Sequence, residues 1–293
     1  MSIGFIGLGI MGESMSENLI KKTGQTVYVY DVDKSKIEKL VDKGAKAAES
    51  IENIAKNCDV IFSMVPKSEH VRMVAKELIP HLREGQIWVD MSTIEPEVSR
   101  EIAKEVQMKG AVMLDAPVVK SKAAAISGTL GIYVGGDKEA YERIKPYLSC
   151  MGSNIIYLGS NGMGLNMKII HNMLVAQIQN SVNEMFVFAK SLGMNLNDVV
   201  EAISYGGGQN FYLDTKHKAI INKDFTTAFS VANMHKDVNI AFNMMKNLGL
   251  NLKGFNLVKD IYDRAVENYS DKDFSATYLI VSNEEGDGGD NEA

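Results

Sequence analysis

Short apolar runs alternate with amphipathic stretches over the first half of the chain. Helical spacing of apolar positions is clearest at about 68–83 and 95–109. The runs that predict buried strands cover residues 2–7, 26–30, 60–65, 86–90, 111–116, 130–134 and 154–158. Strands that alternate with helices are typical of α/β proteins, so we predict a Rossmann-type, doubly wound, mainly parallel sheet that ends near residue 160.

The pattern changes at Gly162, after which strand signals stop and long helical patterns follow. The first helix is expected to run to Leu192, about 30 residues or roughly 45 Å. Apolar side chains occur on several of its sides, which indicates burial against other helices and against another subunit. We therefore predict a dinucleotide-binding Rossmann domain over 1–160, an all-helical substrate and oligomerisation domain over 161–283, and an acidic tail over 284–293.

Composition narrows the class of protein. With 45% hydrophobic and 23% charged residues, the chain resembles ordinary globular proteins. No apolar run approaches the roughly 20 residues that span a bilayer, so we expect no membrane segment. The chain has a formal net charge of −6. Five acidic residues, and no basic ones, lie in the tail, which we expect to be disordered. The rest of the chain therefore has a net charge of −1, so it lacks the overall positive charge that attracts nucleic acid.

The positions of the cysteines and histidines argue against metal and thiol redox chemistry. Cys58 and Cys150 form no metal or redox motif, and so few cysteines indicate a reducing compartment, which we take to be the cytoplasm. The five histidines show no ligand spacing with carboxylates or thiols, so no metal is expected.

A glycine turn joins the first strand to the first helix. Gly7, Gly9 and Gly12 form a G-x-G-x-x-G pattern, and Asp31 ends the next strand. In this order the first glycine permits the tight turn, the second lets the backbone approach a pyrophosphate, and the third lets helix and strand pack closely. The helix N-terminus adds free N–H groups. The carboxylate of Asp31 can accept hydrogen bonds from the ribose hydroxyls and would repel a 2′-phosphate, which favours NAD over NADP.

A second glycine-rich turn, residues 159–164, leads into the long predicted helix. Lys168 and Asn172 are four residues apart, so they share one helix face, with His171 beside them. A lysine in a mostly apolar stripe loses hydration unless a partner compensates it. Either Lys168 reaches solvent and Asn172 bonds its neighbours, or the pair forms a functional site.

Several stretches together resemble the β-hydroxyacid dehydrogenase family, which includes 3-hydroxyisobutyrate dehydrogenase and tartronate semialdehyde reductase. They are spread over nearly the whole chain, at 4–12, 115–118, 128–130, 159–172 and 235–241. The resemblance implies that Lys168 is the catalytic lysine, that Asn172 is its partner, and that the enzyme is a homodimer or homotetramer. It also implies that Lys236 and Asp237 lie at the cofactor and domain interface. The glycine turn and the resemblance together indicate a set of cofactor-binding residues. They are Gly7, Leu8, Gly9, Ile10, Met11, Gly12, Asp31, Val65, Pro66, Ser92, Thr93 and Lys236.

The predicted substrate loop departs from the family pattern. After Asp-Ala-Pro-Val the family usually reads Ser-Gly-Gly, whereas this chain has Val119, Lys120 and Ser121. A basic residue and a hydroxyl residue in place of the two glycines resemble the sulfolactaldehyde reductase subgroup, whereas Val119 and His171 depart from it. A lysine ammonium with three donors and a serine hydroxyl suit a sulfonate, which has three oxygens and stays ionised. We take these four residues as the substrate-binding set.

The resulting functional hypothesis is hydride transfer from NADH to a short anionic aldehyde, with Lys168 as general acid. The first interpretation is reduction of 3-sulfolactaldehyde to 2,3-dihydroxypropane-1-sulfonate. The second is an NAD-dependent dehydrogenase for a carboxylate such as 3-hydroxyisobutyrate, 4-hydroxybutyrate or tartronate semialdehyde. A third is a non-catalytic NAD-binding protein, against which the presence of both Lys168 and Asn172 argues.

Overall fold

The computed structural model describes residues 1–283, and the predicted acidic tail, 284–293, lies outside the described residues. The chain divides into two compact units, with the border between Lys168 and Ile169. This border falls later than the predicted change at 160, because the first turns of the long helix pack with the α/β unit.

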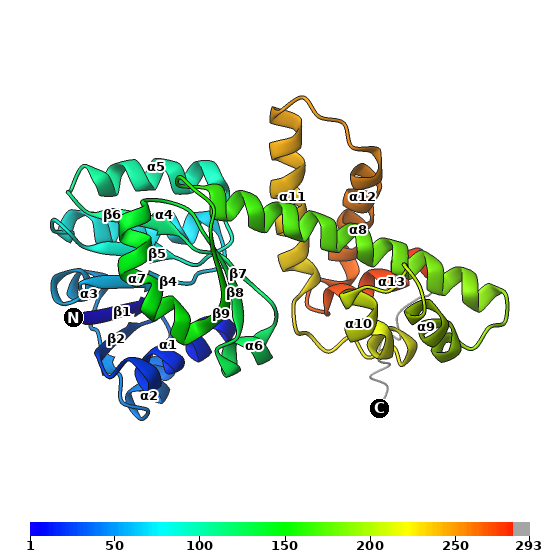
Figure 1. Cartoon of the computed structure of the whole chain (residues 1–293), viewed down its shortest axis with the longest axis horizontal. Helices are drawn as coiled ribbons and strands as arrows, with labels where there is room; N and C mark the ends of the chain where they lie inside the picture. Colours follow the sequence, from blue (N-terminus) through cyan, green and yellow to red (C-terminus); the bar gives the residue numbers. More distant parts are fainter. Residues whose placement is uncertain (284–293) are drawn as a thin grey trace, which may run out of the picture. The chain divides into compact units, whose positions relative to one another are not determined.

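A parallel sheet forms the centre of the first unit (Figure 1). Its strands are β1 (Ser2–Ile6), β2 (Thr26–Tyr30), β3 (Lys46–Ala47), β4 (Val60–Ser63), β5 (Ile87–Asp90) and β6 (Val112–Asp115). They lie in the order β3-β2-β1-β4-β5-β6, and every neighbouring pair is parallel. The order reverses between β1 and β4, as in other doubly wound sheets, which confirms the predicted fold class.

Helices cover both faces of this sheet. They are α1 (Ile10–Thr23), α2 (Lys34–Val41), α3 (Ile51–Asn57), α4 (Ser68–Leu78) followed by a 3₁₀ turn (Ile79–His81), α5 (Pro96–Gln107) and α7 (Lys138–Met151). Phe5 and Phe62 pack in a core with α1 and α7, whereas Ile61 and Trp88 face a second core with α3, α4 and α5. Burial on both faces explains why these strands are continuous apolar runs.

The last predicted strands form a separate small sheet, which corrects the expectation of one sheet. It contains β7 (Val118–Val119), β8 (Leu130–Val134) and β9 (Gly152–Tyr157), with the short helix α6 (Lys122–Ser127) between β7 and β8. β7 runs antiparallel to β8, so it turns the chain away from the ladder of β6. An isolated antiparallel bridge between Asp115 and Gly135 joins the two sheets.

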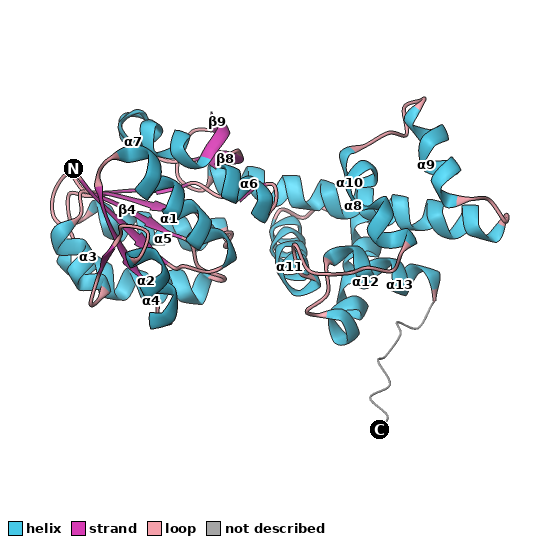
Figure 2. Ribbon diagram, turned by 90° about the horizontal axis from the view of Figure 1, so that it is seen from below, coloured by secondary structure: helices cyan, strands magenta, loops and turns pink. Residues whose placement is uncertain are grey.

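Within its described residues, the second unit is built from helices joined by loops (Figure 2). Its elements are α8 (Met163–Ser191), which starts in the first unit, α9 (Leu196–Ser204), α10 (Phe211–Ile221), α11 (Val231–Asn247), α12 (Lys253–Tyr269), a 3₁₀ turn η2 (Phe274–Ala276) and α13 (Thr277–Ser282). Phe186, Phe255 and Tyr262 are buried in its core. Over residues 1–283, the helices are either too short or too polar to cross a bilayer.

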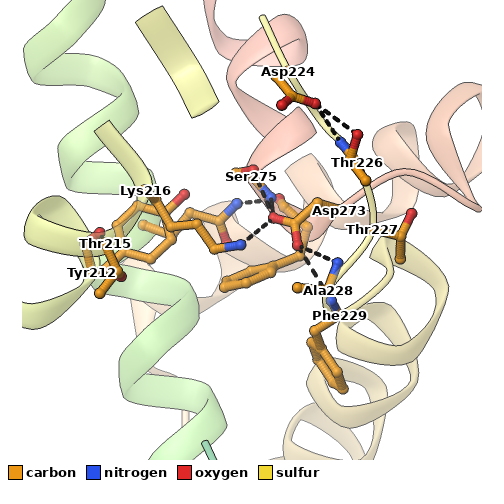
Figure 3. A network of polar contacts seen from close by, with 12 residues as sticks. Tyr212, Thr215, Lys216, Asp224, Thr226, Thr227, Ala228, Phe229, Asp273 and Ser275 are labelled. Carbon is orange, nitrogen blue, oxygen red and sulfur yellow. Dashed lines mark hydrogen bonds and ion pairs between the residues drawn. The ribbon is translucent and has the colours of Figure 1, made fainter. Parts of the chain in front are cut away.

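A buried ion pair braces the loops of the helical unit (Figure 3). Asp273 accepts hydrogen bonds from the ammonium of Lys216 at 2.8 Å and from the backbone amides of Ala228 and Phe229 at 3.1 and 3.2 Å. The hydroxyl and amide of Ser275 complete the set at 2.7 and 3.1 Å. Burial raises the pKa of Asp273, but the bonds from Lys216 and Ser275 outweigh it and hold that pKa below its ordinary value.

Candidate functional site

The carboxyl ends of four parallel strands meet at one edge of the large sheet. Register pairs Ile6 with Ser63, Ser63 with Asp90, and Asp90 with Asp115. The loops that follow β1, β4 and β5 therefore begin side by side. In open α/β sheets, ligands bind beyond this edge where the strand order reverses, here between β1 and β4.

The glycine turn after β1 is built by close backbone contacts. Gly7 has a φ of 91° and donates its amide to the Tyr30 carbonyl at 2.9 Å. A Cβ on Gly12 would lie 1.9 Å from the Gly7 carbonyl oxygen, so only glycine lets α1 begin here. A Cβ on Gly9 would meet no atom of the described part of the chain within 4 Å, so the backbone is approachable at this position.

The first turn of α1 lies directly beyond this open position. Gly9 is its N-cap and supplies no side-chain hydrogen bond to the turn. Leu8 is buried, while Ile10 is 64% exposed and Met11 is half-buried. An open backbone and a helix N-terminus without a side-chain cap fit the pyrophosphate of a dinucleotide.

Asp31 braces the glycine turn from the end of β2. Its side chain is 8% exposed, and it accepts the amides of Leu8 at 2.6 Å and Asp33 at 2.8 Å. Lys36 lies 3.6 Å away as an ion-pair partner. The same carboxylate that is predicted to bind ribose therefore also holds the turn in shape.

Asp90 joins the loops after β4 and β5. Its Oδ1 accepts the hydroxyls of Ser63 and Ser92, each at 2.7 Å, and Ser92 Oγ accepts the amide of Val65 at 2.9 Å. Pro66 is exposed and Thr93 is half-buried just beyond these contacts. Burial raises the pKa of Asp90 to about 6, against the opposing effect of the two serines.

The start of α8 is fixed to β6 by another buried acid. Asp115 accepts the amide of Gly162 at 2.7 Å and that of Leu165 at 2.9 Å. Burial raises its pKa, although these two bonds oppose the shift. Lys168 lies three residues after Leu165 on α8 and is 8% exposed, so the interpretation that it simply reaches solvent is wrong.

Asn172 belongs to the second unit, one turn further along α8. It is 5% exposed, and its amide nitrogen donates to Asp237 of α11 at 2.6 Å. Lys236 lies 3.1 Å from the other oxygen of Asp237, and His171 is half-buried. A carboxylate accepts only from the NH₂ end of the amide, so the Asn172 oxygen faces away from Asp237.

The predicted substrate loop lies at the edge of the small sheet. Lys120 has a φ of 81°, a region that favours glycine, and its ammonium donates to the Thr129 carbonyl at 2.7 Å. Ser121 is exposed and is the N-cap of α6, while the buried Val119 packs against Gly131. Beside them is a cavity of about 460 Å³, lined by Val119, Lys120, Gly131, Tyr133, Asn154, Ile155 and Ile156.

The predicted residues thus fall into separate groups. The predicted cofactor residues from Gly7 to Thr93 lie at one edge of the sheet. Asp115 connects the helix that carries Lys168 to that edge. Asn172, Lys236 and Asp237 form a cluster of the helical unit. The sequence analysis does not predict the hydrogen bonds of Asp90 and Asp115. The signal available for them is that each is an acid that ends a buried apolar strand.

Within 1–283, no three His, Cys, Asp or Glu side chains gather to hold a metal ion.

Known family models match both halves of the chain. Residues 2–159 match the family model described as the NAD-binding domain of 6-phosphogluconate dehydrogenase. Residues 162–281 match the model described as NAD-binding of NADP-dependent 3-hydroxyisobutyrate dehydrogenase. The fold and its glycine turn thus define a dinucleotide-binding oxidoreductase.

Individual relatives cover nearly the whole chain. The 2-hydroxy-3-oxopropionate reductase of Escherichia coli is 32% identical, over 92% of both chains. The NAD-dependent L-serine dehydrogenase of Pseudomonas aeruginosa is 31% identical, over 97% of this chain and 99% of its own. The structure of Mycobacterium tuberculosis 3-hydroxyisobutyrate dehydrogenase with L-serine superposes with a TM-score of 0.90 at 30% identity, covering 96% and 98%. The chain belongs to the β-hydroxyacid dehydrogenase family, of the 3-hydroxyisobutyrate dehydrogenase type.

Proposed function

We propose that this protein interconverts a short hydroxy acid and the corresponding aldehyde, with NAD(H) as hydride carrier and Lys168 as general acid or base. The observation that carries the proposal is the burial of Lys168 on a helix whose start is bonded to the sheet edge. Lysine side chains are almost never fully buried, so the burial of Lys168 at this place favours a catalytic role.

The cofactor would be held by the glycine turn, the first turn of α1 and the loops containing Val65 and Ser92. When bound, reduced nicotinamide supplies the hydride to the carbonyl carbon. Asp31 supports NAD as the preferred form, because its carboxylate at the end of β2 repels a 2′-phosphate.

Lys168 donates a proton or hydrogen bond to the carbonyl oxygen as negative charge develops there, and takes the proton back in the oxidative direction. Asn172 assists from one turn along α8. Asp237 orients its amide, so the Asn172 oxygen faces the other way and accepts from the lysine or from a substrate hydroxyl.

The test of this role is Lys168→Ala. We expect turnover to fall roughly 10²- to 10⁴-fold because the proton donor is lost. NADH affinity, followed by fluorescence titration, is expected to stay within about twofold, since the glycine turn is untouched. Lys190→Ala, an exposed lysine near the end of the same helix, is the matched control. Retention of more than about a tenth of turnover in Lys168→Ala would contradict the proposal.

A sulfonate substrate, 3-sulfolactaldehyde, is a second candidate because of Lys120. A non-glycine residue at this φ carries a backbone cost of about 1 kcal/mol or more. This cost favours a role for the Lys120 side chain that glycine could not fill. Thr129 occupies one of its three N–H donors, and the other two suit a tetrahedral anion. A carboxylate remains the alternative head group, since Ser121 and backbone N–H groups suffice for it.

The two head groups are separated by Lys120→Gly, a change that the local φ accommodates. For a sulfonate enzyme we expect kcat/KM with 3-sulfolactaldehyde to fall at least about tenfold more than with tartronate semialdehyde, since one charged contact contributes on the order of 1.5 kcal/mol. Lys122→Ala, an exposed neighbour on α6, serves as control. An equal loss on both substrates, or no loss, would remove the sulfonate candidate.

A further inference from the structure

Asp115 acts as an N-terminal cap for a helix that it does not precede in sequence. It is the last residue of β6 and is fully buried. One carboxylate oxygen accepts the amide of Gly162, just before α8, and the other accepts that of Leu165, the third residue of α8.

The residue just before α8 is Gly162, so the capping side chain comes from elsewhere in the fold. A helix leaves its first N–H groups without intrahelical partners, and an anion there also meets the positive end of the helix dipole. Gly162, with a φ of 87°, has no side chain to accept them. Asn161 adds a second tether, since its amide donates to the Met113 carbonyl of β6 at 2.7 Å.

Two glycines bring these segments into backbone contact. A Cβ on Gly164 would lie 2.4 Å from the Tyr133 carbonyl oxygen and 2.8 Å from the Asp115 carboxylate. A Cβ on Gly135 would lie 2.7 Å from the same carboxylate and 2.8 Å from the Gly164 nitrogen. The start of α8 is therefore determined by the ends of β6 and β8, with no side chain between them to adapt.

Lys168 follows Leu165 within the same turn of α8, inside the first unit. We propose that Asp115 is a positioning residue for the reaction: by capping α8 from β6 it fixes the Lys168 amine relative to the carboxyl edge of the sheet. This inference rests on the catalytic role given to Lys168 under the proposed function.

A carboxylate is required at this position, because both of its oxygens face backbone N–H donors. An asparagine offers one acceptor oxygen and turns an NH₂ group towards the second amide. Asp115→Asn is therefore expected to release one end of the contact while keeping the volume of the side chain.

The kinetic test compares Asp115→Asn with the native enzyme. A displacement of about 1 Å at a reacting group costs on the order of 10²-fold, so we expect kcat to fall about 10- to 100-fold. The KM for NADH is expected to stay within about twofold, because the glycine turn is unchanged. The primary deuterium isotope effect on kcat, measured with NADH labelled at C4, is expected to rise as hydride transfer becomes rate-limiting.

Matched variants separate positioning from general stability. Gly164→Ala keeps the carboxylate but pushes the start of α8 away, so the same kinetic signature is expected, and it carries the test if Asp115→Asn does not fold. Asp137→Asn makes the same chemical change at the cap of α7, where Asp137 accepts the Ala140 amide at 2.7 Å. Its kcat and isotope effect are expected to match those of the native enzyme.

Hydrogen exchange supplies a readout without turnover. Amides of residues 162–168 are expected to exchange faster in Asp115→Asn and to remain unchanged in Asp137→Asn. Native exchange in this segment would overturn the capping role. Faster exchange with native kcat and isotope effect would overturn the positioning role. If Lys168→Ala keeps its turnover, the proposed function fails; if only Asp115→Asn behaves like the native enzyme, this inference alone fails.

Discussion

Asp90 is a buried carboxylate with one oxygen bonded to two serine hydroxyls, whereas its other oxygen has no hydrogen-bond partner among residues 1–283. Burial raises its pKa to about 6, compared with about 3.9 for an unfolded aspartate. Between these two values the folded chain retains a proton that the unfolded chain has lost. The stability of the native protein therefore falls as pH rises through this window and levels off above it.

Asp90→Asn removes this titration and keeps an oxygen for both serines. We expect the stability of the variant relative to the native protein to rise by about 2–3 kcal/mol between pH 4 and pH 7. Any constant cost of the new NH₂ group contributes equally at both values. Urea unfolding at each pH measures the difference, and parallel stability curves for the two proteins would contradict this prediction.

At the scale of elements, the ion pair between Lys216 of α10 and Asp273 joins α10 to the loops before α11 and η2. The folded-state pKa of Asp273 is lowered, so its stabilisation is fully present above the ordinary pKa of an aspartate. That stabilisation is lost as pH falls through the folded-state pKa.

Lys216→Met leaves the carboxylate of Asp273 buried without its cation. Removal of one partner from a buried pair costs about 3–5 kcal/mol, and the partial exposure of Lys216 places the expected loss near 3 kcal/mol at pH 7. We expect the loss to shrink as pH approaches 4, because the buried carboxylate of the variant, without the cation that lowers its pKa, becomes protonated. Calorimetry at both values tests this, with the exposed Lys218→Met of the same helix as control. A loss independent of pH would contradict the ionic explanation.

Elements with a local signature were predictable from sequence. Gly7, Gly9 and Gly12 follow a buried strand, and the first long helix of the second half was expected close to its observed end at Ser191. β7 was not predictable, because two residues show no periodicity and its antiparallel partner lies beyond α6. α2 and α3 were missed as well, although Asp33 and Ser50 cap them.

Across the whole molecule, contacts between distant residues escaped prediction. The motif that contains Asp115 was recognised, yet its bonds to Gly162 and Leu165 arise only when β6 and α8 are brought together in the fold. The same holds for Asn172, whose partner Asp237 belongs to another helix. The bond from Lys120 to Thr129 likewise depends on how β7 and β8 pair.

The border between the two compact units falls within a single helix, near its start and just after Lys168. Chain segments expressed on either side of that border would each inherit one member of the proposed amine and amide pair. Even an intact chain would lose the pairing through one inserted residue, because each residue rotates an α-helix by about 100°. The proposed pair of Lys168 and Asn172 therefore depends on one unbroken helix.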